Sequence, residues 1–135
     1  MPVARVGDEA VAETRVSTDA IDAFAELSGD ENPIHLDEEY AADTMFGGRV
    51  AHGMLSAGVV SAALAELPGD IVYLSQELTF ENPVFPGDDV RAEVSVVEEL
   101  GGDRIRVETE ALVPERNEHI LDGEAIVLSI PHETG

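Results

Sequence analysis

The residues best suited to chemistry are an acid and an imidazole, Asp30 and His35, within the stretch SGDENPIHL at positions 28–36. A carboxylate beside an imidazole can hold one water molecule, so that one partner removes a proton while the other donates one. The pKa of histidine lies near neutral pH, which suits proton transfer in both directions. Asn32 lies between them in sequence and can orient either side chain through its amide. On these residues alone, a helix cap and a solvated histidine remain the more ordinary interpretation.

Gly53 is the second candidate, in the segment His52-Gly53-Met54-Leu55 that opens the most apolar stretch of the chain. At a helix N-terminus its backbone N–H has no intrahelical partner and carries positive partial charge. Glycine lets a ligand oxygen approach that N–H closely, which is how an oxyanion hole forms for a developing enolate. The alternative is that Gly53 simply begins a helix beneath a sheet.

The elements before these candidates follow from hydrophobic periodicity and capping signals. Residues 10–16 alternate apolar and polar and predict a strand. Residues 17–19 are an N-cap cluster, and the apolar stripe after them predicts a helix that ends at Ser28-Gly29. Residues 30–36 are predicted to form a loop, because Asn32-Pro33 favours extended backbone and disfavours helix. A short helix over 37–44 follows.

The second half of the chain changes from helical to strand periodicity. A helix from Gly53 to about Leu67 is apolar on nearly all sides, which predicts that it is buried. Four strands are then predicted, over 71–80, 90–99, 104–113 and 120–130, with a hairpin turn at 101–102. The order of the predicted elements, with one strand first, then helices and then a meander of strands, predicts an α+β fold. We expect a single domain over residues 1–135, with an antiparallel sheet curled around one central helix.

Charge is the most unusual feature of the composition. The chain has 29 acidic residues against seven basic ones, all of them arginine, and a formal charge of −22. A field of this sign repels nucleic acid and anionic lipid, so neither is expected as a partner. An acidic protein surface of this kind can serve a protein partner, but adaptation to high salt is favoured, because a Debye length of roughly 3 Å at 1 M screens the self-repulsion. We therefore predict a halophilic protein.

Other residue types exclude several classes of site. The chain has no cysteine, so it has neither disulfides nor thiolate chemistry. No apolar stretch reaches the roughly 18 residues that span a bilayer, and no basic segment precedes an apolar run at the start, which predicts a cytoplasmic protein without a membrane partner. The four histidines, at positions 35, 52, 119 and 132, share no spacing typical of metal ligands, so no metal is expected.

The segment from Phe24 to His35, FAELSGDENPIH, with Ala41 six positions on, resembles the hydratase-2 motif of the MaoC-like, (R)-specific enoyl-CoA hydratases. The segments HGML at 52–55, the strand at 73–80 and NPVF at 82–85 are similar to the same family. The resemblance covers about residues 17–130. The chain resembles the short, single-domain members that feed polyhydroxyalkanoate synthesis.

The resemblance implies the hot-dog fold, with the helix from Gly53 inside the sheet. It also implies a homodimer whose two sheets join edge to edge, with an acyl-CoA thioester bound near the subunit interface. Asp30 and His35 match the catalytic acid/base pair that activates water in this family. Gly53 matches the amide that polarises the thioester carbonyl, and Asn32 matches a supporting residue of the motif.

The implied reaction is reversible syn addition of water to a trans-2-enoyl-CoA, which gives the (R)-3-hydroxyacyl-CoA without a metal or redox cofactor. The resemblance places Ser61 and Leu64 along the acyl pocket. It assigns no base to the CoA phosphates, for which Arg49 is a candidate, with a surface salt bridge as the alternative. Two rival functions stay open, a 3-hydroxyacyl-thioester dehydratase acting on another carrier and a non-catalytic acyl-binding hot-dog module. Hot-dog thioesterases lack the Asp30, Asn32 and His35 pattern.

Overall fold

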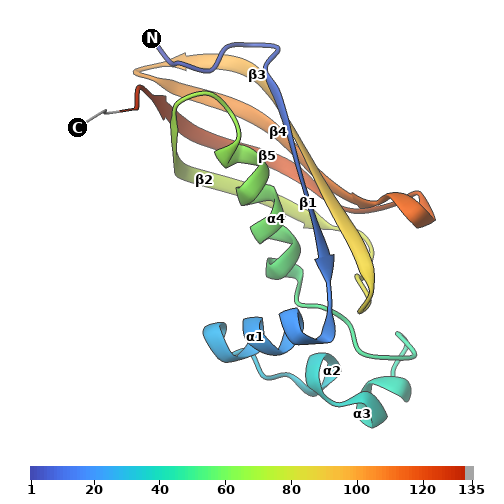
Figure 1. Cartoon of the computed structure of the whole chain (residues 1–135). Coiled ribbons are helices and arrows are strands. Elements are labelled where there is room, and N and C mark those ends of the chain that lie inside the picture. Colours follow the sequence, from blue (N-terminus) through green and yellow to red (C-terminus); the bar gives the residue numbers. More distant parts are fainter. Residues whose placement is uncertain (133–135) are drawn as a thin grey trace.

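The computed structural model describes residues 1–132, so the last three positions of the predicted domain, 133–135, lie outside the described residues. One sheet wraps around a single long helix, and three short helices lie together beyond one end of that helix (Figure 1). In chain order the elements are β1 (Glu9–Val16), α1 (Thr18–Ser28), α2 (Pro33–Leu36), α3 (Glu38–Ala42), α4 (Gly53–Ala65), β2 (Asp70–Phe80), β3 (Asp88–Gly101), β4 (Arg104–Val113), a 3-10 turn (Pro114–Arg116) and β5 (Glu118–Ile130).

The sheet is antiparallel with the strand order β1-β3-β4-β5-β2. The predicted meander is therefore right for β3, β4 and β5 and wrong for β2, which pairs with β5 at one edge. The segment 81–87 between β2 and β3 contains Pro83 and Pro86, and it leads the chain away from β2 instead of turning it back. Period-two alternation identifies strands but not their partners.

The core lies between α4 and the concave face of the sheet. Val60 and Leu64 of α4 pack in one buried cluster with inward-facing residues of the strands, such as Val94 and Val107. The predicted burial of α4 on all sides is wrong for this chain. The exposed residues of the helix are Gly53, Met54, Gly58, Ser61, Ala62 and Ala65. The reason is that the sheet covers only one side of the helix. An apolar composition indicates that burial of a surface is favourable, but it does not show which part of the chain covers that surface.

Local signals position the short helices. The Ser17 side chain accepts a hydrogen bond from the Ala20 N–H at 3.1 Å, and α1 ends at Gly29 with φ 81°. Asn32 is extended, with φ −54° and ψ 134°, as predicted. The prediction that no helix forms over 30–36 is wrong, because Pro33 begins the one-turn helix α2. Proline suits the first helical position, where a backbone N–H would have no partner.

Asp37 ends α2 and caps α3, the helix predicted over 37–44, through a hydrogen bond from the Tyr40 N–H at 3.1 Å. The chain then returns through residues 43–52 to the start of α4 (Figure 1). This return brings the loop after α1, helix α2 and the N-terminus of α4 to the same end of the sheet. Within residues 1–132, no helix is both long and apolar enough to cross a membrane.

Candidate active site

Asp30 lies in the turn that follows α1, and Asn32 holds its carboxylate. The Asp30 Oδ1 accepts hydrogen bonds from the Asn32 N–H at 3.3 Å and from the Asn32 side-chain amide at 3.2 Å. The backbone N–H of Asn32 is the main cause of a lowered pKa for Asp30, and the hydrogen bond from the Asn32 side chain lowers it further. Desolvation opposes these effects, but the Asp30 side chain is 44% exposed. Asp30 is therefore held as a carboxylate that solvent can reach.

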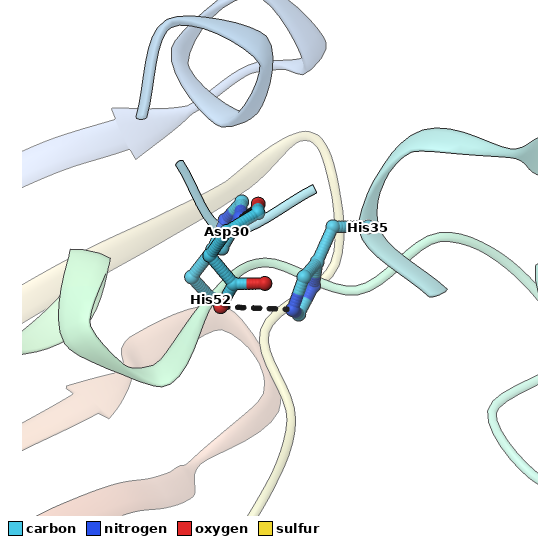
Figure 2. Close-up of side chains that lie close together, drawn as sticks. All are labelled: Asp30, His35 and His52. Carbon is cyan, nitrogen blue, oxygen red and sulfur yellow. Dashed lines mark hydrogen bonds and ion pairs between the residues drawn. The ribbon is translucent and has the colours of Figure 1, made fainter. Parts of the chain in front are cut away.

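His35 lies on α2, and Val50 fixes the orientation of its ring. The His35 Nδ1 lies 2.7 Å from the Val50 carbonyl oxygen, and the Val50 N–H donates to the Ile34 carbonyl at 3.1 Å. A carbonyl oxygen only accepts, so the Nδ1 of His35 carries a proton, and in the neutral imidazole the Nε2 then has a free lone pair. This Nε2 lies 4.0 Å from the Asp30 Oδ2 (Figure 2).

The separation of Asp30 and His35 suits a shared water molecule. Two atoms 4.0 Å apart are too far for a direct hydrogen bond, yet one oxygen can lie at ordinary hydrogen-bond distance from both. Both atoms are acceptors in this protonation state, which matches the two hydrogens of one water. The structure thus brings the two predicted residues within reach of one water molecule, while their catalytic role stays a prediction.

Gly53 is the first residue of α4, and it lies with His35 at an apolar pocket of about 350 Å³. Among the pocket's other residues are Phe46, Phe80 and Ile120. A Cβ at position 53 would lie only 2.9 Å from the Phe80 Cε1, so any larger residue there would force the aromatic ring to move. Phe80 belongs to β2, far along the chain, and neither local pattern nor spacing links it to Gly53.

The other predicted residues lie elsewhere. Ser61 is exposed on the open side of α4, and Leu64 is 1% exposed within the core, so neither lines the pocket. Arg49 is engaged within the chain: its Nε donates to the His35 carbonyl at 2.6 Å, and its guanidinium pairs with Asp22 at 2.6 Å. Its side chain is only 11% exposed, which favours the alternative of a salt bridge over a phosphate contact.

His52 is a member of this group that sequence reasoning did not assign to the site. Its ring stacks on that of His35 with centroids 3.8 Å apart, and its Nε2 lies 2.8 Å from the Asp30 carbonyl oxygen. Figure 2 shows the three side chains gathered in one place. The available signal was its position next to Gly53, but a histidine at a helix start has many ordinary uses.

These three residues also meet a distance criterion for metal binding. One ligand atom each of Asp30, His35 and His52 lies within 4.8 Å of the others, and this is the sole such group in the described part of the chain. One ring nitrogen of His35 and one of His52 lies at a backbone carbonyl oxygen, so the other nitrogen of each ring is the potential metal ligand. The prediction that no metal is needed therefore stays a prediction.

The site combines two proton acceptors, Asp30 and His35, with a backbone hydrogen-bond donor, the Gly53 N–H, around one pocket. Asp30 and His35 can take a proton from water and return one to a carbon. The N–H of Gly53 at the start of α4 has no partner within the helix and can stabilise negative charge on a carbonyl oxygen bound there. These groups suit addition of water to a double bond conjugated with a carbonyl, and its reversal.

Comparison with known proteins gives the same family from sequence and from structure. The MaoC like domain matches residues 4–117. The chain is 44% identical over 124 residues to the 3-hydroxybutyryl-CoA dehydratase of Methylorubrum extorquens, covering 90% of this chain and 78% of that protein. It is 40% identical over 124 residues to the (R)-specific enoyl-CoA hydratase of Aeromonas caviae, covering 90% and 92%.

A solved structure extends the likeness to the whole fold. The unliganded R-hydratase PhaJ1 from Pseudomonas aeruginosa superposes with a TM-score of 0.87 at 36% identity, covering 99% of this chain and 92% of that one. This likeness confirms the predicted hot-dog fold. The chain belongs to the MaoC-like family of hydratases and dehydratases, which are hydro-lyases with the hot-dog fold.

Proposed function

We propose that the protein is an (R)-specific enoyl-CoA hydratase, which adds water reversibly to a trans-2-enoyl-CoA to form the (R)-3-hydroxyacyl-CoA. The observation that carries the proposal is the 4.0 Å separation of the Asp30 Oδ2 and the His35 Nε2 beside the pocket that holds Gly53. The relatives named above act as hydratases and dehydratases on such thioesters, which supports both the reaction class and the carrier.

In the proposed mechanism, one water molecule donates hydrogen bonds to Asp30 and His35. The pair removes one proton as the water oxygen bonds to C3, and electrons move from the double bond to the thioester oxygen. The Gly53 N–H stabilises the resulting enolate. One proton then returns from the pair to C2 on the same face, which gives syn addition and restores the starting protonation state. Asn32 supports the reaction by holding Asp30.

The apolar pocket accounts for binding of a carbon chain, since its walls include Phe46, Phe80 and Ile120. We keep Ser61 and Leu64 as proposed acyl-pocket residues of the assembled protein. The reaction is redox-neutral, so we expect no cofactor beyond the CoA of the substrate. Polyhydroxyalkanoate synthesis or fatty acid metabolism in the cytoplasm is the proposed setting.

We also propose that the protein is a homodimer. Strand β2 is at an edge of the sheet, where its backbone groups are free to pair, and it exposes Val72, Tyr73 and Leu74. The adjacent open side of α4 exposes Met54. A second copy that joins edge to edge at β2 would cover both surfaces. Light scattering in high salt measures the mass, and a monomer at all concentrations would rule out this assembly.

The test of the function is the decay of enoyl-thioester absorbance with crotonyl-CoA in high salt. Wild type should hydrate the substrate, and the near-isosteric variants Asp30→Asn and His35→Gln should lose most of the rate while keeping the wild-type circular dichroism spectrum. A coupled assay with an (R)-specific dehydrogenase reports the stereochemistry. An inactive wild type, or folded variants with full rate, would overturn the assignment.

The same assay separates the two rival functions. An acyl-carrier-protein thioester turned over much faster than the CoA thioester would favour a dehydratase of that carrier. Binding of acyl thioesters with no turnover of either, in both directions, would indicate a non-catalytic acyl-binding module. The intact Asp30 and His35 favour catalysis, because a module that only binds acyl groups has no use for the pair.

A further inference from the structure

The His52 side chain contacts both halves of the Asp30–His35 pair. Its ring lies against the His35 ring at 3.8 Å with an interplanar angle of 26°. On another side it meets the Phe24 ring of α1, with centroids 4.8 Å apart. The residue is 2% exposed, so these contacts enclose the imidazole almost completely. A buried histidine costs free energy unless its polar atoms are used.

The hydrogen bond of His52 determines the protonation of its ring. Its Nε2 lies 2.8 Å from the backbone carbonyl oxygen of Asp30, and a carbonyl can only accept, so Nε2 carries a proton. Its Nδ1 is buried and has no hydrogen-bond partner among residues 1–132. A proton on that nitrogen would be a buried donor without an acceptor, which favours the neutral ring.

The position of His52 in the chain adds a third connection. It is the residue directly before Gly53 and forms the N-cap of α4, with its own carbonyl accepting from the Leu55 N–H at 3.1 Å. The backbone that sets the direction of the Gly53 N–H is therefore continuous with the residue whose side chain touches Asp30 and His35. Asp30, His35 and Gly53, which come from separate elements, are thus all connected to His52.

We infer that His52 is a positioning residue that keeps the Asp30 carboxylate, the His35 ring and the Gly53 amide in register for the proposed hydration. The stacked ring limits rotation of His35, which has Val50 on only one of its nitrogens. The bond to the Asp30 carbonyl fixes the backbone of the turn that carries the carboxylate. A neutral aromatic ring also stabilises positive charge on His35 when it holds a proton, as in other contacts between cations and aromatic faces.

The inference rests on the proposed function for its kinetic test, which compares variants that keep or lose the donor. Glutamine has the same number of bonds from Cα to its amide nitrogen as histidine has to Nε2, so His52→Gln can still donate to the Asp30 carbonyl. The amide of His52→Asn is too short to reach it, and His52→Phe keeps the stacking ring without a donor. His119→Phe is the matched control, because His119 is an exposed histidine outside the site.

We expect kcat on crotonyl-CoA to fall by about 100-fold in His52→Phe and His52→Asn, with KM within about threefold, because misplaced catalytic groups slow the reaction more than they weaken binding. His52→Gln should recover at least about tenfold of that loss, and His119→Phe should match wild type. Asn and Gln variants with equal kcat, or a folded Phe variant with wild-type kcat, would overturn the inference.

Hydrogen exchange of the backbone gives a measurement that does not depend on activity. Residues 28–36 should exchange faster in His52→Asn than in wild type, the Gln variant should restore protection, and residues 104–113 of β4 should not change. If wild type proves inactive but this pattern holds, the proposed function fails and the positioning role stands. If wild type is active and residues 28–36 exchange equally in the Asn, Gln and wild-type proteins, the positioning role fails.

Discussion

Two carboxylate–imidazole pairs in this protein have nearly the same spacing and very different surroundings. The Asp30 Oδ2 lies 4.0 Å from the His35 Nε2, and the Glu110 Oε2 lies 3.8 Å from the His119 Nδ1. The His35 side chain is 9% exposed, whereas that of His119 is 57% exposed. His35 is anchored by the Val50 carbonyl and opens on an apolar pocket. Glu110 and His119 lie on neighbouring strands at the surface.

The comparison shows that two acid–histidine pairs of similar spacing can differ in everything that surrounds them. In the first pair, each side chain has a backbone partner that fixes its direction, and a backbone donor lies in the same pocket. In the second pair, the acid stands in a row of like charges, because Glu110 is opposite Glu93 on β3 and Asp122 on β5. Preorganised partners, and not proximity, distinguish the site.

The largest difference should appear when each of the two pairs is disrupted by substitution in separate variants. We expect Asp30→Asn and His35→Gln to lower kcat/KM on crotonyl-CoA by about 100-fold to 10,000-fold, the usual contribution of acid–base groups. Glu110→Gln and His119→Gln should leave it within about twofold. Steady-state kinetics in high salt make the comparison. A similar loss in both pairs would mean that charge or folding, and not water activation, underlies the effect.

A smaller loss of activity should follow from substitution of Gly53, which lies at the Asp30–His35 site and has no counterpart at the Glu110–His119 pair. In Gly53→Ala the new methyl group meets the Phe80 ring at 2.9 Å, and Phe80 is 48% exposed, so the ring can swing aside. We expect a stability cost of about 1 kcal/mol and a fall in kcat of roughly 10-fold to 100-fold, because both the pocket and the approach to the amide change. Thermal unfolding and kinetics separate the two effects, and an unchanged kcat would exclude Gly53 from the chemistry.

The row of acids around Glu110 should make the stability of the protein depend on salt. Facing acids across β3, β4 and β5 repel each other, and salt screens this repulsion. We expect the melting temperature to rise between roughly 0.1 M and 2 M KCl, in line with the predicted halophilic character. Glu110→Gln should raise stability at low salt by up to about 1 kcal/mol and reduce the salt dependence. Equal stability of wild type in low and high salt would contradict both expectations.

A finer test concerns the pKa of Asp30, which the Asn32 backbone N–H lowers most. Because the folded pKa lies below the unfolded value, this carboxylate stabilises the fold above its ordinary pKa, and the contribution is lost as pH falls through the folded pKa. Asn32→Ala keeps that N–H and removes only the side-chain amide, so the pKa of Asp30 should rise but stay below its usual range. Carbon-13 NMR of the Asp30 carboxyl group measures its titration in wild type and in Asn32→Ala.

No effect is expected from metal removal. Dialysis against EDTA, followed by assay in chelator-treated high-salt buffer, should leave kcat on crotonyl-CoA unchanged, because water activation is assigned to Asp30 and His35. Loss of activity that zinc or another divalent ion restores would instead assign a metal to the cluster of Asp30, His35 and His52.

Local sequence determined the elements, because periodicity and caps act over a few residues. The strand β1, the capped helix α1 and the later strands lie where alternation and turn residues predicted them. The loop that brings Asp30 near His35 is also local, since Asn32 and Pro33 restrict the backbone between them. Proline acted in two ways there, and only one of them, the extended residue before it, was predicted.

Tertiary structure alone decided which distant groups surround the Asp30–His35 pair. Val50 orients His35, the His52 ring covers it, and the Phe80 ring lies against Gly53. Each contact joins residues 15 or more positions apart, so it depends on how the chain returns to the same end of the sheet and not on any local pattern. The edge position of β2 and the open side of α4 have the same origin, because strand pairing and coverage are properties of the folded chain.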